Sequence, residues 1–388
     1  MDIQLKPLVA GKTPEDTTVV VAMSGGVDSS VAAGLLHKLG YKVIGITLQL
    51  WDYTPASEGE GTEKKFGTCC ALDDVYDARR VCQTLGVPHY VMNYESEFKD
   101  KVVDDFVETY LAGATPIPCV RCNQRIKFDS FMDKAKSLGA DILVTGHYVR
   151  KELLEDGTPV LCKGEDKKKD QSYFLFTTTP EQLAFSDFPL GRLNKDETRA
   201  LAKDLGLHVH GKKDSQDICF VPGGDYREVV RKYAPEAIQK GNFIDEQGNV
   251  LGKHEGVLGY TVGQRKGLPG GFEMPMYVVE IRANTHEVVL GPRESLGKKV
   301  FTVKELNWLS DQMIDGLEVT VKVRYAHDTS PAILKDLGGG RVQVDMLAPE
   351  EQVSPGQAAV FYDDDVLLGG GWIEVPESAK VKIQFQPA

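Results

Sequence analysis

A glycine-rich turn near the start of the chain carries one acidic and three hydroxyl side chains. Residues 24–30 read SGGVDSS; the apolar run TTVVVAM precedes them and the helical pattern SSVAAGLLHKL follows. Two glycines let a backbone turn tightly and approach a ligand, and the first turn of a helix presents N–H groups and the positive end of the helix dipole. The turn therefore predicts a site for an anion such as phosphate.

Two widespread phosphate-binding patterns do not describe this turn. It lacks the Gly-Lys-Ser/Thr ending of a Walker P-loop, and its glycines lack the spacing of the Rossmann dinucleotide fingerprint. A strand-to-helix turn that Asp or Ser merely caps is the alternative interpretation. We prefer the anion site because paired glycines stand here between a strand and a helix.

Three of the seven cysteines lie in motifs that suggest chemistry. Cys119 and Cys122 form a CxxC pair in TPIPCVRCNQRIKF, and Cys219 lies 97 residues after Cys122 in KKDSQDICFVPGGDY. A CxxC pair can be a redox couple, half of a zinc site or part of an iron–sulfur site, and its spacing does not choose among them. Basic neighbours would favour the nucleophilic thiolate at Cys122 and Cys219. These neighbours are Arg121, Arg125, Lys212 and Lys213.

The remaining four cysteines, at positions 69, 70, 82 and 162, are expected to be ordinary buried residues. The adjacent pair at 69 and 70 is poorly spaced to complete a zinc site with the CxxC pair. A thioredoxin-like redox site is not favoured, because it requires CxxC at a helix start in a much smaller fold.

Apolar runs of strand type alternate with helical patterns from residue 17 to about residue 145. The predicted strands are TTVVVAMS, YKVIGITLQLW, VPHYVMNY and DILVTGHY, and the predicted helices span residues 29–39, 73–85, 98–110 and 128–138. Strands that alternate with helices of about 10 to 15 residues form a parallel sheet covered on both faces. We therefore predict a doubly wound α/β domain over residues 1–220, with SGGVDSS directly after its first strand.

Two further, β-rich regions are expected. A basic, polar stretch and then a helix over residues 195–205, which starts with Asn-Lys-Asp-Glu, complete the α/β domain. Short alternating segments such as MYVVEIRA and HEVVLGPR follow, and from residue 298 short strands recur at roughly ten-residue spacing. We predict a small central α+β domain, mainly β, over residues 221–297 and a C-terminal β-barrel over residues 298–388.

Charge and composition narrow the class of protein. The chain has 388 residues, 45 of them basic and 57 acidic, for a formal net charge of −12, and no window approaches 18 consecutive apolar residues. Diffuse attraction to phosphate backbones and a membrane span are therefore not expected, so any nucleic-acid contact must use local basic patches. The N-terminal residues lack a leader pattern and the cysteines are few, so we expect a cytoplasmic protein.

Seven sequence blocks resemble those of the tRNA-specific 2-thiouridylases, which belong to the PP-loop ATP pyrophosphatases. In chain order they are AMSGGVDSSVAAGLL, TPIPCVRCNQRIKF, LVTGHYVR, KDQSYFLF, KKDSQDICFVPGGDY, GYTVGQRKGL and VRY, and they extend from about residue 20 to residue 360. The resemblance implies an adenine nucleotide hydrolase-like fold and a sulfurtransferase that uses ATP with Mg²⁺. Such an enzyme adenylates the 2-oxygen of the wobble uridine (position 34) of tRNA, then transfers sulfur to carbon 2, releasing AMP and pyrophosphate.

The resemblance also implies partners and assigns residues. The partners are the anticodon stem-loop of tRNA and a sulfur donor protein, either a cysteine desulfurase or a sulfur relay protein. ATP would lie against Ala22, Met23, Ser24, Gly25, Gly26, Val27, Asp28, Ser29, Leu48 and Gly146. The tRNA would contact Ile117, Pro118, Cys119, His147, Lys169, Asp170, Gln171, Arg324, Tyr325 and Gln357, the first three beside the target base.

Two sulfur routes are open at this stage. In the first, which the resemblance implies, Cys219 carries a persulfide and the nucleophile Cys122 resolves it through a disulfide. In the second, Cys119, Cys122 and Cys219 hold a [4Fe-4S] cluster whose open iron carries the sulfur. Many family members have Asn at the position of Ile117 and Asp at that of Cys119, so this chain departs from the pattern at both.

Two other functions fit the sequence less well. A PP-loop ligase that adenylates a small molecule would leave CVRC and DICF without a role. An RNA-binding module with a degenerate ATP domain conflicts with the intact SGGVDSS turn.

Overall fold

The computed structural model describes residues 7–51, 72–214, 218–221, 224–235, 238–351 and 353–375. The chain divides into two compact units that interleave along the sequence. The first comprises residues 1–102, 119–224 and 365–367, and the second comprises residues 103–118, 225–364 and 368–388. The domain boundaries expected near residues 220 and 297 remain predictions. Cys69 and Cys70 lie outside the described residues.

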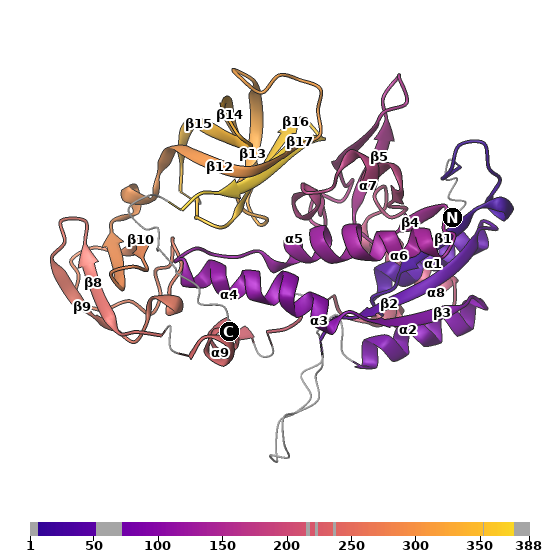
Figure 1. The fold of residues 1–388 in the computed structure, drawn as a ribbon, viewed down its shortest axis with the longest axis horizontal. Coiled ribbons are helices and arrows are strands. Elements are labelled where there is room, and N and C mark those ends of the chain that lie inside the picture. The colour runs from indigo at the N-terminus through magenta and orange to yellow at the C-terminus, as the bar shows by residue number, and fades with distance from the viewer. Residues whose placement is uncertain are drawn as a thin grey trace, which may run out of the picture. The chain divides into compact units, whose positions relative to one another are not determined.

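The first unit is built on a five-stranded parallel sheet (Figure 1). Its strands are β1 (Thr18–Ala22), β2 (Lys42–Gln49), β3 (His89–Asn93), β4 (Ile142–Val144) and β7 (Ser186–Asp187). They lie in the order β3-β2-β1-β4-β7, and every neighbouring pair is parallel. The strand order reverses direction at β1, whose two neighbours are β2 and β4. This confirms the predicted α/β class and creates a switch point at the carboxyl end of β1.

Helices connect these strands. The first unit contains α1 (Val27–Lys38), α2 (Leu72–Leu85), α3 (Glu95–Phe98), α6 (Phe131–Ser137), α7 (Pro180–Ala184) and α8 (Lys195–Asp204). Helix α5 (Pro118–Cys122) begins one residue before the second segment of this unit, which starts at residue 119. The predicted helices over 29–39, 73–85 and 195–205 are confirmed within two residues at each end. Helix α8 starts with a capping box, in which Asn194 and Glu197 bond each other's backbone N–H groups.

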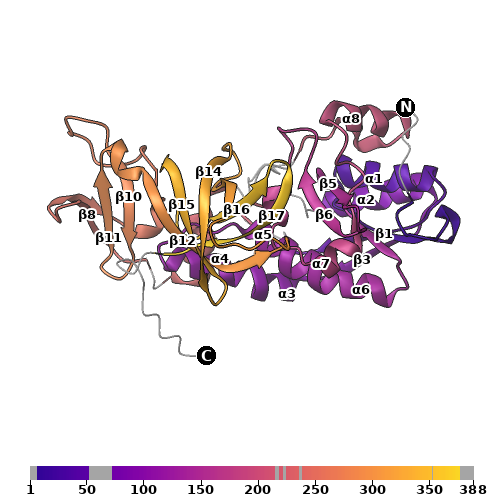
Figure 2. The same ribbon diagram turned by 90° about the horizontal axis from the view of Figure 1, so that it is seen from above.

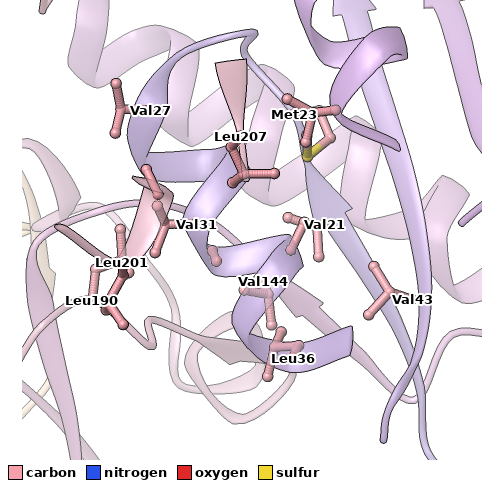
Figure 3. Close-up of a cluster of buried hydrophobic side chains, with 14 of the residues drawn as sticks. Val21, Met23, Val27, Val31, Leu36, Val43, Val144, Leu190, Leu201 and Leu207 are labelled. Carbon is pink, nitrogen blue, oxygen red and sulfur yellow. The ribbon is translucent and has the colours of Figure 1, made fainter. Parts of the chain in front are cut away.

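The first unit's apolar core lies between the sheet and helices α1, α2 and α8. Val21 of β1, Val31 and Leu36 of α1 and Leu201 of α8 belong to one buried cluster (Figure 3). Val20 is also fully buried, and because side chains alternate along a strand it points to the opposite face of the sheet. Burial of each such side chain contributes about 1.5–3 kcal/mol. The core thereby fixes β1 and α1, and with them the turn that joins the two elements.

Two predicted helices begin earlier than expected. The helix expected from residue 98 begins at Glu95, and a π-helical stretch at Lys99–Val103 separates α3 from α4 (Asp104–Leu111). The helix expected from residue 128 is preceded directly by a π-helical stretch, Asn123–Ser130, and by α5. Pro118 begins α5, where a proline loses no intrahelical bond. The CxxC pair is therefore helical, whereas the sequence pattern had placed it before the helix.

A β-hairpin was missed by the sequence analysis. Strands β5 (Val149–Leu153) and β6 (Pro159–Lys163) pair antiparallel just before the basic stretch. Gly157 in the connecting turn has a φ of +87°, a conformation that glycine adopts readily. Asp156-Gly157 between two alternating segments is a hairpin signal that the sequence did contain.

The second unit holds a small sheet and a closed barrel (Figure 2). The small sheet has the order β10-β11-β8-β9, from β8 (Gly241–Asp245), β9 (Val250–His254), β10 (Tyr277–Arg282) and β11 (Glu287–Gly291). The barrel strands are β12 (Lys298–Trp308), β13 (Glu318–Lys322), β14 (Ser330–Gly338), β15 (Arg341–Glu350), β16 (Ala358–Asp363) and β17 (Val366–Ile373). Strand β12 pairs with both β15 and β17, which closes the barrel and confirms that prediction.

An early segment of the chain packs within this second unit. Tyr110 of α4 stacks on Tyr226 of α9 (Tyr226–Tyr233), with ring centroids 4.6 Å apart and an interplanar angle of 2°. Thr115 N–H donates to the carbonyl of Pro355 at 2.8 Å. Residues 103–118 thus contact residues that follow them by more than 100 positions in the sequence. No described helix is long and apolar enough to cross a membrane.

Candidate active site

The SGGVDSS turn joins β1 to α1 at the switch point of the sheet. Gly26 is the N-cap residue of α1, and the hydroxyl of Ser30 donates to its carbonyl at 2.7 Å. The backbone N–H of Ser24 donates to the hydroxyl of Ser29 at 3.1 Å. These bonds fold the turn over the first residues of α1. Ligands of open α/β sheets bind at this place, and the N-terminus of a 12-residue helix favours an anion there.

Two positions of this site require glycine, because backbone atoms of other segments lie too close to leave room for a Cβ atom. Gly25 has a φ of +71°, and a Cβ atom on it would lie 2.1 Å from the carbonyl oxygen of Asp74. A Cβ atom on Gly146, in the loop after β4, would lie 2.6 Å from the backbone nitrogen of Ser29. The loop after β4 therefore packs directly on the first turn of α1. Leu48 lies near the carboxyl end of β2, beside β1, so the residues expected to line a nucleotide come from three adjacent strands.

A group of ion pairs lies against the turn. We call Asp28, Lys169, Lys195, Arg199 and Asp214 the loop-side ion-pair group. Lys195 Nζ contacts Asp28 Oδ1 at 2.8 Å and Oδ2 at 2.9 Å, and it lies 2.7 Å from Asp214 Oδ1. Asp214 also pairs with Lys169 at 2.6 Å and with Arg199 at 3.0 Å. Burial alone would raise the pKa of Asp214, but hydrogen bonds from Lys169 and Lys195 outweigh it and lower that pKa.

Tyr148 fixes the acidic residue of the turn from the other side. Its hydroxyl donates to Asp28 Oδ1 at 2.8 Å and lies 2.9 Å from the hydroxyl of Thr198. Burial first, and then the charge of Asp28, raise the pKa of Tyr148. The phenol therefore stays protonated and can donate its hydrogen bond. Tyr148 and Asp28 thus join the loop after β4 to the first turn of α1.

A second lysine holds the backbone of the turn. Lys212 Nζ donates to the carbonyl of Gly25 at 3.0 Å, to Asp74 Oδ1 at 2.6 Å and to Asp77 Oδ2 at 2.5 Å. Burial would lower the pKa of Lys212, but its bonds to Asp74 and Asp77 outweigh burial and raise it. Lys212 therefore remains charged and ties the turn to α2.

The three cysteines with motif context lie in different surroundings. Cys119 is exposed and Cys122 is buried, although both belong to α5. Cys219 is half-buried in a turn, next to Phe220, whose ring contacts Phe98 and Trp51 at centroid distances of 5.6 and 5.9 Å. The aromatic contacts anchor the turn that carries Cys219. Cys82 and Cys162 are buried as predicted.

Asn123, directly after Cys122, is itself buried and bonded. Its Nδ2 donates to the carbonyl of Phe174 at 3.1 Å, and its Oδ1 accepts from Lys127 Nζ at 3.0 Å. The π-helical stretch after Cys122 is therefore fastened to residue 174, in the block KDQSYFLF. In the part of the chain described, no group of three or more His, Cys, Asp or Glu side chains is arranged to hold a metal ion.

His147 is neutral near pH 7. Burial first, and then the charge of Lys127, lower the pKa of His147 well below its usual value. Its Nδ1 lies 2.7 Å from the hydroxyl of Thr145, and its ring lies near those of Phe128 and Phe188 at 6.2 and 6.4 Å. A neutral ring offers a hydrogen bond or a stacking surface rather than a positive charge.

Residues 169–171, which are predicted to contact tRNA, differ in burial and in their hydrogen bonds. Asp170 is buried, and its carboxylate accepts from the backbone of Gly164 and Ser172. Gln171 Oε1 accepts the backbone N–H of Tyr148 at 2.9 Å. Lys167 and Lys168, just before them, are exposed. Asp170 and Gln171 therefore shape the loop, and the lysines give it a positive surface.

The predicted tRNA residues of the second unit also make internal bonds. Arg324 Nη2 donates to Ser354 Oγ at 2.7 Å and to the carbonyl of Val262 at 3.1 Å. Gln357 Nε2 donates to the carbonyl of Thr115 at 3.0 Å, two residues before Ile117. Tyr325 is 38% exposed, and Lys322 Nζ lies 5.5 Å from the centre of its ring.

The sequence analysis missed three residues at the turn, Tyr148, Lys195 and Asp214, as site residues. It expected Lys212 only as a basic neighbour of Cys219, whereas Lys212 Nζ bonds Gly25, Asp74 and Asp77. Tyr148, Lys212 and Asp214 stand inside the blocks LVTGHYVR and KKDSQDICFVPGGDY, so a signal for them was present. Lys195 stands outside every block, and the sequence pattern indicated it only as part of a helix start.

Comparison with known proteins gives one family over nearly the whole chain. Residues 17–223 match the family described as tRNA methyl transferase HUP domain, residues 227–292 its PRC-barrel domain, and residues 298–373 the aminomethyltransferase beta-barrel domain. The chain is 50% identical over 376 residues to tRNA-specific 2-thiouridylase MnmA of Roseobacter denitrificans, covering 95% of this chain and 97% of the relative.

Two further relatives agree. The protein of the same name from Rickettsia bellii is 52% identical over 359 residues, covering 92% of this chain and 96% of the relative. The protein of this name from Wolbachia pipientis is 50% identical over 373 residues, covering 96% of this chain and 99% of the relative. With the anion-type turn at the switch point and the closed barrel, this similarity shows that the chain belongs to the tRNA-specific 2-thiouridylase family.

Proposed function

We propose that the protein uses ATP to replace the 2-oxygen of the wobble uridine of tRNA with sulfur. The observation that carries this proposal is the SGGVDSS turn, built for a phosphate at the switch point, in a chain about half identical to relatives named 2-thiouridylases. A uridine 2-carbonyl is a poor electrophile, so transfer of AMP to its oxygen makes that oxygen a leaving group. The α1 N-terminus and the turn backbone would hold the ATP phosphates, with Mg²⁺ as counter-ion.

The decisive assay measures pyrophosphate release and thiolated tRNA together. Pyrophosphate release should require a tRNA with a wobble uridine and should match the amount of 2-thiouridine formed. A ligase for small molecules would release pyrophosphate without tRNA. That result would contradict the proposal.

For the sulfur step, we propose the persulfide route. A [4Fe-4S] cluster needs several cysteine thiolates around one point, and as arranged here Cys119, Cys122 and Cys219 do not form such a group. In the proposed route a donor protein, a cysteine desulfurase or a sulfur relay protein, loads a sulfane sulfur on Cys219. The terminal sulfur attacks carbon 2 of the adenylated uridine, the C2–O bond breaks, and AMP leaves with the oxygen.

The remaining S–S bond is then broken by the second cysteine. The thiolate of Cys122 attacks Sγ of Cys219, which forms a Cys122–Cys219 disulfide and leaves the delivered sulfur on carbon 2. A thiol reductant restores both cysteines. The half-buried position of Cys219 beside the anchored Phe220 supports its role as an accessible carrier.

We expect tRNA binding to weaken steeply with salt despite the net charge of −12. The positive side chains at 167–169 would replace counterions on phosphates, and Lys167 and Lys168 are exposed. Replacing all three with alanine should make the plot of log affinity against log salt less steep, by about 0.7–0.9 for each phosphate whose lysine is removed. A wild-type slope near zero would contradict a local basic patch.

Substituting Gly146 should impair ATP binding. The added Cβ of Gly146→Ala would lie 2.6 Å from the backbone nitrogen of Ser29, so the start of α1 must shift. Overpacking of this kind costs about 1–3 kcal/mol, which predicts a roughly 5- to 150-fold loss of ATP affinity if all of it acts on the turn. Gly211→Ala is the matched control, because no atom lies within 4 Å of its added Cβ. Equal ATP affinity of both variants would show that the close approach at Gly146 does not matter for the nucleotide.

A further inference from the structure

The SGGVDSS turn needs positive charge that its own residues do not supply. Its side chains are three hydroxyls, one valine and the carboxylate of Asp28. The triphosphate of ATP is strongly anionic, and a Walker loop would bring its own lysine, which this turn lacks. A cation from elsewhere in the chain would complete the phosphate site beside Mg²⁺.

Lys195 is placed to be this cation. It is the first residue of α8, and its Nζ bridges both carboxylate oxygens of Asp28, at 2.8 and 2.9 Å, and Asp214 at 2.7 Å. Asp28 is the second residue of α1, so the ammonium group lies at the same helix turn that offers its N–H groups. The side chain of Lys195 is only 12% exposed, and its Nζ lies 5.8 Å from the ring centre of Tyr148.

Lys195 and Lys212, the two lysines near the turn, bond different parts of it. Lys195 Nζ bonds the carboxylate of Asp28 in the first turn of α1, and Asp166 Oδ2 accepts the backbone N–H of Lys195 at 3.2 Å. Lys212 Nζ instead bonds the carbonyl of Gly25 and two carboxylates of α2, Asp74 and Asp77. Lys195 is therefore the better candidate to meet a phosphate at the N-terminus of α1.

We infer that Lys195 binds the phosphate chain of ATP, with Asp214 as the counter-ion that holds its ammonium group in place. The inference rests on the ATP use proposed above. During AMP transfer, the bond from the α-phosphorus to the bridging oxygen breaks, and its electron pair passes to pyrophosphate while the uridine 2-oxygen bonds to phosphorus. The ammonium group of Lys195 stabilises the charge that grows on the leaving pyrophosphate. Lys195 is thus a catalytic residue that no motif assigned.

The test compares ATP with adenosine, which lacks phosphates. Binding of each to the full chain is measured by calorimetry with Mg²⁺ and without tRNA. Lys195→Met should weaken ATP binding about 10- to 100-fold, the effect of losing a charged hydrogen bond, and leave adenosine binding unchanged. Lys195→Arg should restore part of the loss. With tRNA present, Lys195→Met should also lower kcat and raise the KM for ATP.

The matched control is Lys203→Met, the same change of charge at an exposed position of α8. It should bind ATP and adenosine like the wild type. If Lys195→Met does not fold, Lys195→Gln keeps a hydrogen-bond donor without the charge and is measured instead. Equal weakening of ATP and adenosine would assign Lys195 a structural role and overturn the inference, as would unchanged ATP binding. A wild type that fails to bind ATP would contradict the proposed function as well.

Discussion

Cys219→Ser and Cys122→Ser are each expected to reduce tRNA thiolation to background while the fold is kept. A serine hydroxyl neither carries a sulfane sulfur nor resolves a persulfide, so no partial route remains. The measurement is 2-thiouridine in tRNA by mass spectrometry after single-turnover reactions with a sulfur donor. Cys162→Ser is the control, because it makes the same change in β6, outside the segments that carry Cys122 and Cys219. Burial raises the pKa of the Cys162 thiol, so this cysteine is a poor nucleophile and the variant should retain activity.

Cys119→Ser separates the two sulfur routes. Cys119 is exposed on α5, and the persulfide route gives it no covalent step, so the variant should keep most of its activity and mass spectrometry should find added sulfur on Cys219. If a cluster acts instead, this variant should lose bound iron and activity together, because two remaining thiolates hold four irons poorly. Iron and sulfide assays on anaerobically purified wild type complete the comparison. Normal activity of Cys219→Ser would contradict both routes.

Asp28→Ala and Ser29→Ala are expected to lower the thiolation rate by a factor on the order of 10² to 10³ each. Asp28 holds Lys195 and Tyr148 at the turn, and the buried hydroxyl of Ser29 accepts the N–H of Ser24. Both changes should therefore act through ATP. Pyrophosphate release and ATP affinity should fall, while tRNA binding, measured separately by filter retention, should persist.

Asp196→Ala is the control for charge, because it removes an exposed carboxylate from the first turn of α8. It should behave as the wild type. An equal loss of tRNA affinity in Asp28→Ala and Ser29→Ala would show that the turn does not separate the nucleotide from the tRNA, and would contradict the prediction.

The sequence predicted those parts of the protein that depend on local pattern. The alternation of strands and helices predicted the α/β class, and the two glycines of SGGVDSS predicted a tight turn between β1 and α1. The closed barrel was predicted from regularly spaced short strands. In each case the physical cause, a buried face or a glycine-dependent turn, acts within a few neighbouring residues.

What the sequence did not predict depends on contacts between distant residues. Lys195 meets Asp28 across 167 positions, and no local periodicity indicates that an ammonium group on one helix reaches the start of another. The early start of the helical segment at Pro118 was missed because apolar spacing there is weak and the proline is equally typical of a loop. Gln357 and Thr115, 242 residues apart, are joined only when the barrel has formed.

The interleaving of the two units sets an order for synthesis. The segment 103–118 belongs to the second unit, and Tyr226, on which Tyr110 stacks, follows it by 116 residues. At about 5–20 residues per second, a ribosome makes Tyr226 roughly 6 to 23 s after Tyr110. During that time Tyr110 of α4 lacks the ring of Tyr226, and we expect a chaperone to bind the exposed apolar face of this segment. For the same reason, a fragment cut at residue 220 would keep α4 without the surface that covers it.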